Sequence, residues 1–133
     1  MAALLDTSVI VRYLTLDPPA QGAVAQTLID GGDAFAIPSV ALVESAFVLT
    51  RLYGIDRDVV VRLLVDLLGK SNLSVPEMPK TLAIQALSLC LGSGRVSFAD
   101  ALLWAAARAS REAVIFTFDR RFPSSGVDVK VLR

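Results

Sequence analysis

Short apolar runs alternate with longer segments of helical periodicity along the chain. The runs are bounded by acids, glycines or prolines, which is typical of short buried strands. We expect strands at residues 2–5, 34–37, 73–75, 113–118 and 127–132. We expect helices at residues 9–15, 20–29, 40–53, 57–68, 80–91 and from residue 98 onward, past Arg108. Strands alternating with helices predict one α/β domain over residues 1–133, with a parallel sheet covered by helices on both faces.

Helix starts carry recognisable capping residues. Ser39, Asp56 and Ser97 each precede a helical segment, so we expect them at N-cap positions. Asp17-Pro18 predicts another start, with Asp17 as N-cap and Pro18 as the first helical residue.

Composition narrows the protein class. The chain is 54% hydrophobic and 20% charged, an excess that indicates either a partner groove or self-association face, or a thick sheet core. The longest uncharged run, residues 81–94, is shorter than the ~18 residues of a membrane span. The start of the chain lacks a basic targeting segment. We therefore expect a soluble, cytoplasmic protein.

Missing residue types exclude several chemistries. The chain has no histidine, which excludes a Ser-His-Asp triad, a Cys-His pair and a histidine-ligated zinc. The single cysteine, Cys90, lies in an apolar run, so we expect a buried thiol in a reducing compartment. Without histidine, the roles of general acid, general base and metal ligand fall mainly on Asp and Glu. The formal net charge is zero, so the chain as a whole has no charge that attracts nucleic acid.

Four acids stand out from the thirteen because of their place in the pattern: Asp6, Glu44, Asp100 and Asp119. Asp6 and Asp119 follow predicted buried strands, whereas Glu44 and Asp100 lie within about two turns of helix starts. In an α/β sheet these places meet at one edge. Converging carboxylates repel unless a cation or protons relieve them, and all-oxygen sites suit Mg²⁺ or Mn²⁺.

Each acid also has a structural explanation. Asp6 can cap the helix that follows it, and Asp100 forms a capping box with Ser97. Asp119 can be a turn residue, and Glu44 can belong to a solvated helix face. Their joint placement favours a site.

Four segments resemble the PIN domain, and more narrowly the VapC-type toxins of toxin–antitoxin modules: DTSVIVRYL from Asp6, the Pro-Ser helix leading to Glu44, FADALLWAAA around Asp100, and TFDRRF around Asp119. The resemblance implies a three-layer α/β/α fold with a central, mostly parallel sheet of four to five short strands. It makes Asp6 and Asp100 the firmest metal ligands, with Asp119 and Glu44 completing the pocket directly or through water. It makes Thr7, Ser8 and Thr117 supporting residues. Ser8 stands where many members have Asn.

The resemblance also implies an activity and partners. The expected reaction is endoribonuclease cleavage of RNA by a metal-activated water, and the expected cofactor is Mg²⁺ or Mn²⁺. A cognate antitoxin would lay an amphipathic segment into a groove and reach the acids with a basic side chain. A homodimer is expected. Arg95, Arg120 and Arg121 are candidates for substrate phosphate, or ordinary surface charges.

Two other classes compete with this interpretation. A PIN-like module can bind RNA or protein without cleaving. A phosphotransfer receiver needs an acid pair after the first strand and a well-placed lysine, and a hydrolase with an aspartate nucleophile needs Asp-x-Asp. The sequence reads Asp6-Thr7-Ser8, and its only lysines are Lys70, Lys80 and Lys130, so both phosphotransfer and aspartyl chemistry fit poorly.

Overall fold

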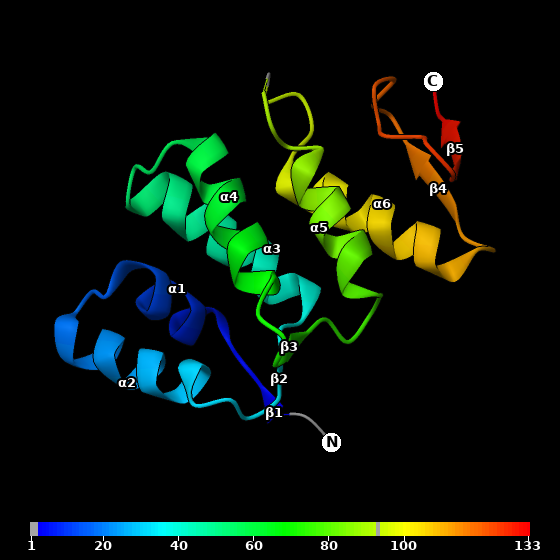
Figure 1. The fold of residues 1–133 in the computed structure, drawn as a ribbon. Helices are drawn as coiled ribbons and strands as arrows, with labels where there is room; N and C mark the ends of the chain where they lie inside the picture. Colours follow the sequence, from blue (N-terminus) through cyan, green and yellow to red (C-terminus); the bar gives the residue numbers. More distant parts are fainter. Residues whose placement is uncertain (1–2, 93) are drawn as a thin grey trace.

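Short parallel strands alternate with helices in the computed structural model of the protein, which describes residues 3–92 and 94–133 (Figure 1). In chain order the elements are β1 (Ala3–Leu4), α1 (Thr7–Thr15), α2 (Pro19–Asp30), β2 (Phe35–Ala36), α3 (Ser39–Phe47), the π-helical turn η1 (Val48–Leu52), α4 (Arg57–Leu68), β3 (Leu73–Ser74), α5 (Lys80–Ser88), α6 (Phe98–Ser110), β4 (Val114–Thr117) and β5 (Asp128–Val131). The predicted α/β class is confirmed, and the arrangement is consistent with the three-layer α/β/α fold. None of the described helices has the length and apolarity needed to cross a membrane.

The five strands divide between two parallel sheets, where the sequence predicted one. β1, β2 and β3 form the first sheet with β2 in the centre. Hydrogen bonds from Leu5 N to Ala36 O (2.9 Å) and from Ile37 N to Ser74 O (2.7 Å) extend it by one residue. In the part of the chain that the structure describes, β4 pairs with β5 and not with β1.

The second sheet is held by α6, which explains the division. Trp104 of α6 is buried and its indole N–H donates to Ser125 O at 2.9 Å, which ties the loop between β4 and β5 to the helix. Ile115 and Phe122 are buried as well. The sequence predicted β4 as a fully buried strand, but Ile115 is its one buried residue. β4 is therefore a half-exposed strand.

The structure confirms one predicted N-cap residue, Ser97, and contradicts two others, Asp17 and Ser39. The Ser97 hydroxyl accepts a hydrogen bond from Asp100 N at 3.0 Å, as predicted. Asp17 is not the N-cap of α2, because Pro18 holds that position and the helix begins at Pro19. Ser39 is the first residue of α3 and not its cap. The Glu77 carboxylate takes over the capping work by accepting from Ser39 N at 3.0 and 3.1 Å.

The remaining predicted helices agree with the structure in place and differ at their ends. Asp56 stands at the N-cap of α4 without a side-chain hydrogen bond to the helix. The single helix predicted over residues 40–53 changes to π-helical hydrogen bonding at Val48. α5 ends at Ser88, three residues before its predicted end.

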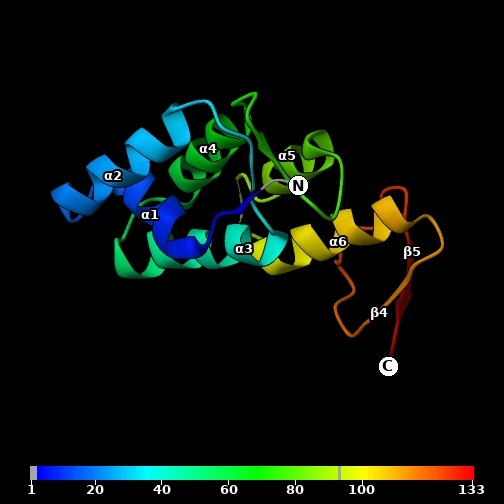
Figure 2. The same ribbon diagram turned by 90° about the horizontal axis from the view of Figure 1, so that it is seen from below.

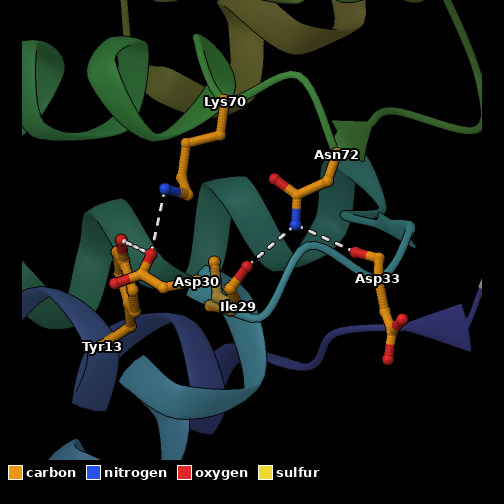
Figure 3. Close-up of polar contacts among 6 residues, drawn as sticks. All are labelled: Tyr13, Ile29, Asp30, Asp33, Lys70 and Asn72. Carbon is orange, nitrogen blue, oxygen red and sulfur yellow. Dashed lines mark hydrogen bonds and ion pairs between the residues drawn. The ribbon is translucent and has the colours of Figure 1, made fainter.

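A polar network holds the amino-terminal side of the first sheet (Figure 3). The Asp30 carboxylate accepts from the Tyr13 hydroxyl at 2.7 Å and lies 2.9 Å from the Lys70 ammonium. The Asn72 amide donates to Ile29 O at 2.8 Å and to Asp33 O at 2.9 Å. These contacts join α1, the end of α2 and the segments that enter β2 and β3. They fix the sheet from one side and leave its carboxyl side to the candidate site.

Candidate functional site

Asp6 follows β1 and caps α1. One carboxylate oxygen, Oδ1, accepts a hydrogen bond from Ser8 Oγ at 2.6 Å and from Val9 N at 3.2 Å. The Ser8 hydroxyl, followed by the Val9 amide, holds the pKa of the Asp6 carboxyl below its usual value. Asp6 is exposed. The capping explanation is therefore confirmed, and the same carboxylate is ionised and open to solvent at neutral pH.

Glu44 shares a pocket with Asp6. The pocket has a volume of about 700 Å³ and lies where the carboxyl ends of β1 and β2 lead into α1 and α3. Thr7 and Ser8 line it from α1, and Glu44 lines it from α3. Apolar side chains form much of its rim, and Leu4, Val40 and Leu52 are 64%, 70% and 76% exposed. The pocket thus combines two carboxylates with an open apolar border.

Arg12 lies in the same pocket, although the sequence analysis did not single it out as a candidate site residue. Its Nη1 donates to Ser8 O at 3.3 Å and its Nε donates to the Gln21 side chain. The Arg12 charge adds a small lowering of the Asp6 pKa. The available signal was spacing, because residues four apart on a helix share a face and Arg12 follows Ser8 by four.

Asp100 occupies the first turn of α6 and is half-buried. It does not line the pocket of Asp6 and Glu44. Arg57 of α4 holds the start of this helix: its Nε donates to Cys90 O at 3.0 Å, and its guanidinium lies 4.6 Å from the centre of the Phe98 ring. Arg57 therefore positions the turn that carries Asp100, which the sequence pattern did not indicate.

Asp119 lies in a tight turn two residues after the end of β4. Its Oδ1 accepts from Arg121 N at 2.9 Å, and its own N–H donates to Thr117 Oγ1 at 3.0 Å. Asp119 is exposed and follows a strand of the second sheet, so it does not share a sheet edge with Asp6. Arg120, Arg121 and Arg95 are exposed, and Arg120 lines a separate pocket with Arg133.

The four acids have the oxygen ligands that a hard cation prefers, but only Asp6 and Glu44 line the same pocket in the described part of the chain. Carboxylate and hydroxyl oxygens are ligands that Mg²⁺ and Mn²⁺ accept. Asp6 and Glu44 open into one pocket, beside the Ser8 hydroxyl. Among residues 3–92 and 94–133, no three acidic, histidine or cysteine side chains are close enough together to hold a metal ion. The structure therefore places two of the four predicted acids, Asp6 and Glu44, along one pocket.

Comparisons with known proteins identify a family. The family model described as the PIN domain matches residues 3–126, which is most of the chain. Neither the curated proteins nor the solved structures contain a match.

Proposed function

Since this chain belongs to the PIN domain family, whose members are generally nucleases, we propose that it is a Mg²⁺- or Mn²⁺-dependent endoribonuclease that hydrolyses phosphodiester bonds. The observation that supports this proposal is the pocket shared by Asp6 and Glu44 at the carboxyl ends of β1 and β2. Ligands of open parallel sheets bind at such edges. The two acids of the pocket can bind a cation, and the arginine beside them can bind a phosphate group.

The residues of the pocket have separable roles in this proposal. Asp6 at the N-cap of α1 and Glu44 of α3 hold the cation, and Asp100 and Asp119, which lie outside this pocket, are the proposed further ligands. A bound divalent cation supplies an activated water and offsets charge on the phosphate. Ser8 fixes the Asp6 carboxylate through Oδ1, which leaves Oδ2 for a ligand. Arg12 binds the substrate phosphate, because a guanidinium donates to phosphate oxygens in pairs.

We further propose that the activity is that of a toxin held by a cognate antitoxin in the cytoplasm. The exposed Leu4, Val40 and Leu52 around the two acids support this. An amphipathic segment of the antitoxin would cover these apolar side chains and place a basic side chain against Asp6. The proposed homodimer has its support in the exposed apolar side chains of α2, Val24 and Leu28.

A cleavage assay with purified protein tests the nuclease proposal. Labelled RNA is incubated with Mn²⁺ and with excess EDTA, using wild type, Asp6→Asn, Glu44→Gln and Asp100→Asn. We expect EDTA to abolish cleavage and each substitution to reduce the cleavage rate at least about 100-fold. Loss of a residue that only supports a metal ligand costs about 10- to 100-fold, so a larger loss indicates a ligand. Asp66→Asn is the matched control, since Asp66 is an exposed acid of α4 outside the pocket. Full activity of Asp100→Asn would remove Asp100 from the site.

A second candidate function is a PIN-like module that binds RNA without cleaving it. The observation that favours it is the lack of a three-acid cluster in the described part of the chain. This module would bind RNA equally in Mn²⁺ and in EDTA and would leave the RNA intact. Induced expression in cells adds a second test, with wild type and Asp100→Asn compared side by side. Growth arrest and discrete RNA fragments with wild type, and neither with the variant, would support the nuclease.

A further inference from the structure

Positive charge is concentrated at the end of the chain. Residues 108–133 contain six Lys or Arg and three Asp or Glu, although the whole chain has a net charge of zero. The preceding residues therefore carry an excess of three acids. Such asymmetry is typical of chains that contact nucleic acid through one region.

The outer face of β4 is aromatic and open to solvent. Val114, Phe116 and Phe118 are 43%, 67% and 74% exposed, whereas Ile115 between them is buried. Side chains alternate along a strand, so Val114 and Phe116 lie on one face of β4, and Phe118 follows at the bend directly after the strand. Figures 1 and 2 both show β4 and β5 beyond α6, away from β1. One exposed phenylalanine of β4 and a second just after the strand are therefore open to solvent, two residues apart in the chain.

Cations border this aromatic face. Lys130 of β5 is the register partner of Phe116, which places the two side chains next to each other on the same face. Asp128 lies 3.6 Å from Lys130, in a pair whose side chains are both more than half exposed. At the carboxyl end of the sheet, Arg120 and Arg133 line a pocket of about 500 Å³ with Val131. One lysine thus lies beside Phe116, and two arginines lie at the carboxyl end of the same two-stranded sheet.

We propose that the β4–β5 sheet is a docking surface for single-stranded RNA. Phe116 and Phe118 stack on two bases, Lys130 contacts the backbone beside them, and Arg120 and Arg133 bind a phosphate at the end of the sheet. Exposed aromatics with basic neighbours match single strands, whose bases are free to stack, and not duplexes, whose bases are covered. The proposal rests on the proposed function in taking RNA as the ligand, and it adds a binding surface separate from the pocket of Asp6 and Glu44.

Binding of a short fluorescent single-stranded RNA, followed by anisotropy in EDTA, tests the surface without cleavage. We expect Phe116→Ala and Phe118→Ala each to weaken binding about 5-fold or more. Phe47→Ala is the matched control, because Phe47 is 55% exposed on α3, and we expect less than a 2-fold change. Circular dichroism confirms that each variant is folded, which is expected since the side chains removed are exposed.

The salt dependence of the same binding tests the cations. For single strands, each phosphate contact adds about 0.7 to the slope of log affinity against log salt concentration. We expect Lys130→Ala with Arg133→Ala to reduce the slope by about 1.4. Arg62→Ala, an exposed cation of α4, leaves the slope unchanged.

The outcomes separate this surface from the nuclease proposal. Unchanged affinity in both phenylalanine variants, no RNA binding by wild type, or equal affinity for a duplex overturns the docking surface. A change from dimer to monomer in these variants with RNA binding retained would identify the face as a protein interface and also overturn it. Wild type that binds RNA through Phe116 and Phe118 but never cleaves it supports the surface and contradicts the nuclease.

Discussion

The hydroxyl of Ser8 donates a 2.6 Å hydrogen bond to the Asp6 carboxylate, two residues before it in the chain. This contact and the Val9 amide occupy the same oxygen of Asp6. One carboxylate therefore stabilises the start of α1 and presents its charge to the pocket that Glu44 shares. The local role of Asp6 in the helix and its proposed role in catalysis are compatible, because they use different oxygens.

Substitutions of Asp6 should separate these two roles. Asp6→Ala removes the cap and lowers the free energy of unfolding by about 1 kcal/mol. Asp6→Asn keeps a capping oxygen and changes stability much less, because asparagine caps helices as well as aspartate. Both variants should lose RNA cleavage. Urea denaturation and the cleavage assay, run on the same preparations, measure the two effects. Equal destabilisation by both substitutions would contradict the capping role.

Gly22 should not tolerate a side chain. A Cβ at this position would lie 2.5 Å from Cα and 2.8 Å from C of Leu16, where the end of α1 crosses α2. Backbone atoms cannot yield as a flexible side chain does, so Gly22→Ala should lower the free energy of unfolding by roughly 1–3 kcal/mol, despite alanine's better helix propensity. Gln26→Ala, at an exposed position of the same helix, should change it by less than about 0.5 kcal/mol. A stabilised Gly22→Ala protein would show that the two helices are not packed this closely.

Ser45 is a buried residue with an unsatisfied hydroxyl. Its side chain is fully buried on α3, and within the described residues its Oγ has no hydrogen-bond partner. Ser45→Ala removes that desolvated group, so the free energy of unfolding should rise by about 1 kcal/mol. Ser88→Ala is the control, since the exposed Ser88 hydroxyl donates to Ile84 O, and thermal unfolding should show little change. Destabilisation by Ser45→Ala would indicate an ordered water or other partner at this hydroxyl.

Cys90 should make stability depend on pH in the alkaline range. Burial raises the pKa of its thiol from 9.0 to about 11. Well below pH 9 the thiol is protonated in both states, and between about pH 9 and 11 the unfolded state is mostly ionised while the native state keeps its proton. The free energy of unfolding should therefore fall by roughly 2–3 kcal/mol as the pH rises through this window.

Cys90→Ala provides the reference for that prediction. It lacks the titrating group, so the difference in stability between the two proteins isolates the thiol from the other groups that titrate at high pH. The native thiol should also react slowly with a thiol reagent at pH 8 and rapidly in denaturant. A pH-independent difference between the proteins would contradict the raised pKa.

The sequence by itself determined the order of helices and strands, because hydrophobic periodicity and helix caps are local properties. Ser97 capped its helix as predicted, and the alternation of elements identified the α/β class. The four acids and their segments pointed to the family that the comparison then identified. Local pattern could not reveal Glu77 as the cap of α3, because the two segments lie 38 residues apart in sequence.

Tertiary packing decided how the strands were divided and which acids met. The sequence predicts β4 as a buried strand, but Trp104 of α6 binds the loop between β4 and β5, and Phe116 of β4 faces solvent. Asp6 and Glu44 came together because β1 and β2 are neighbours in one sheet, and Asp119 stayed apart because β4 is not in that sheet. Strands that are far apart in the chain pair through backbone N–H and C=O groups, which are the same in every residue except proline, so pairing leaves little trace in the sequence. The side-chain pattern therefore predicts that a strand forms but leaves its partner to the packing of the whole chain.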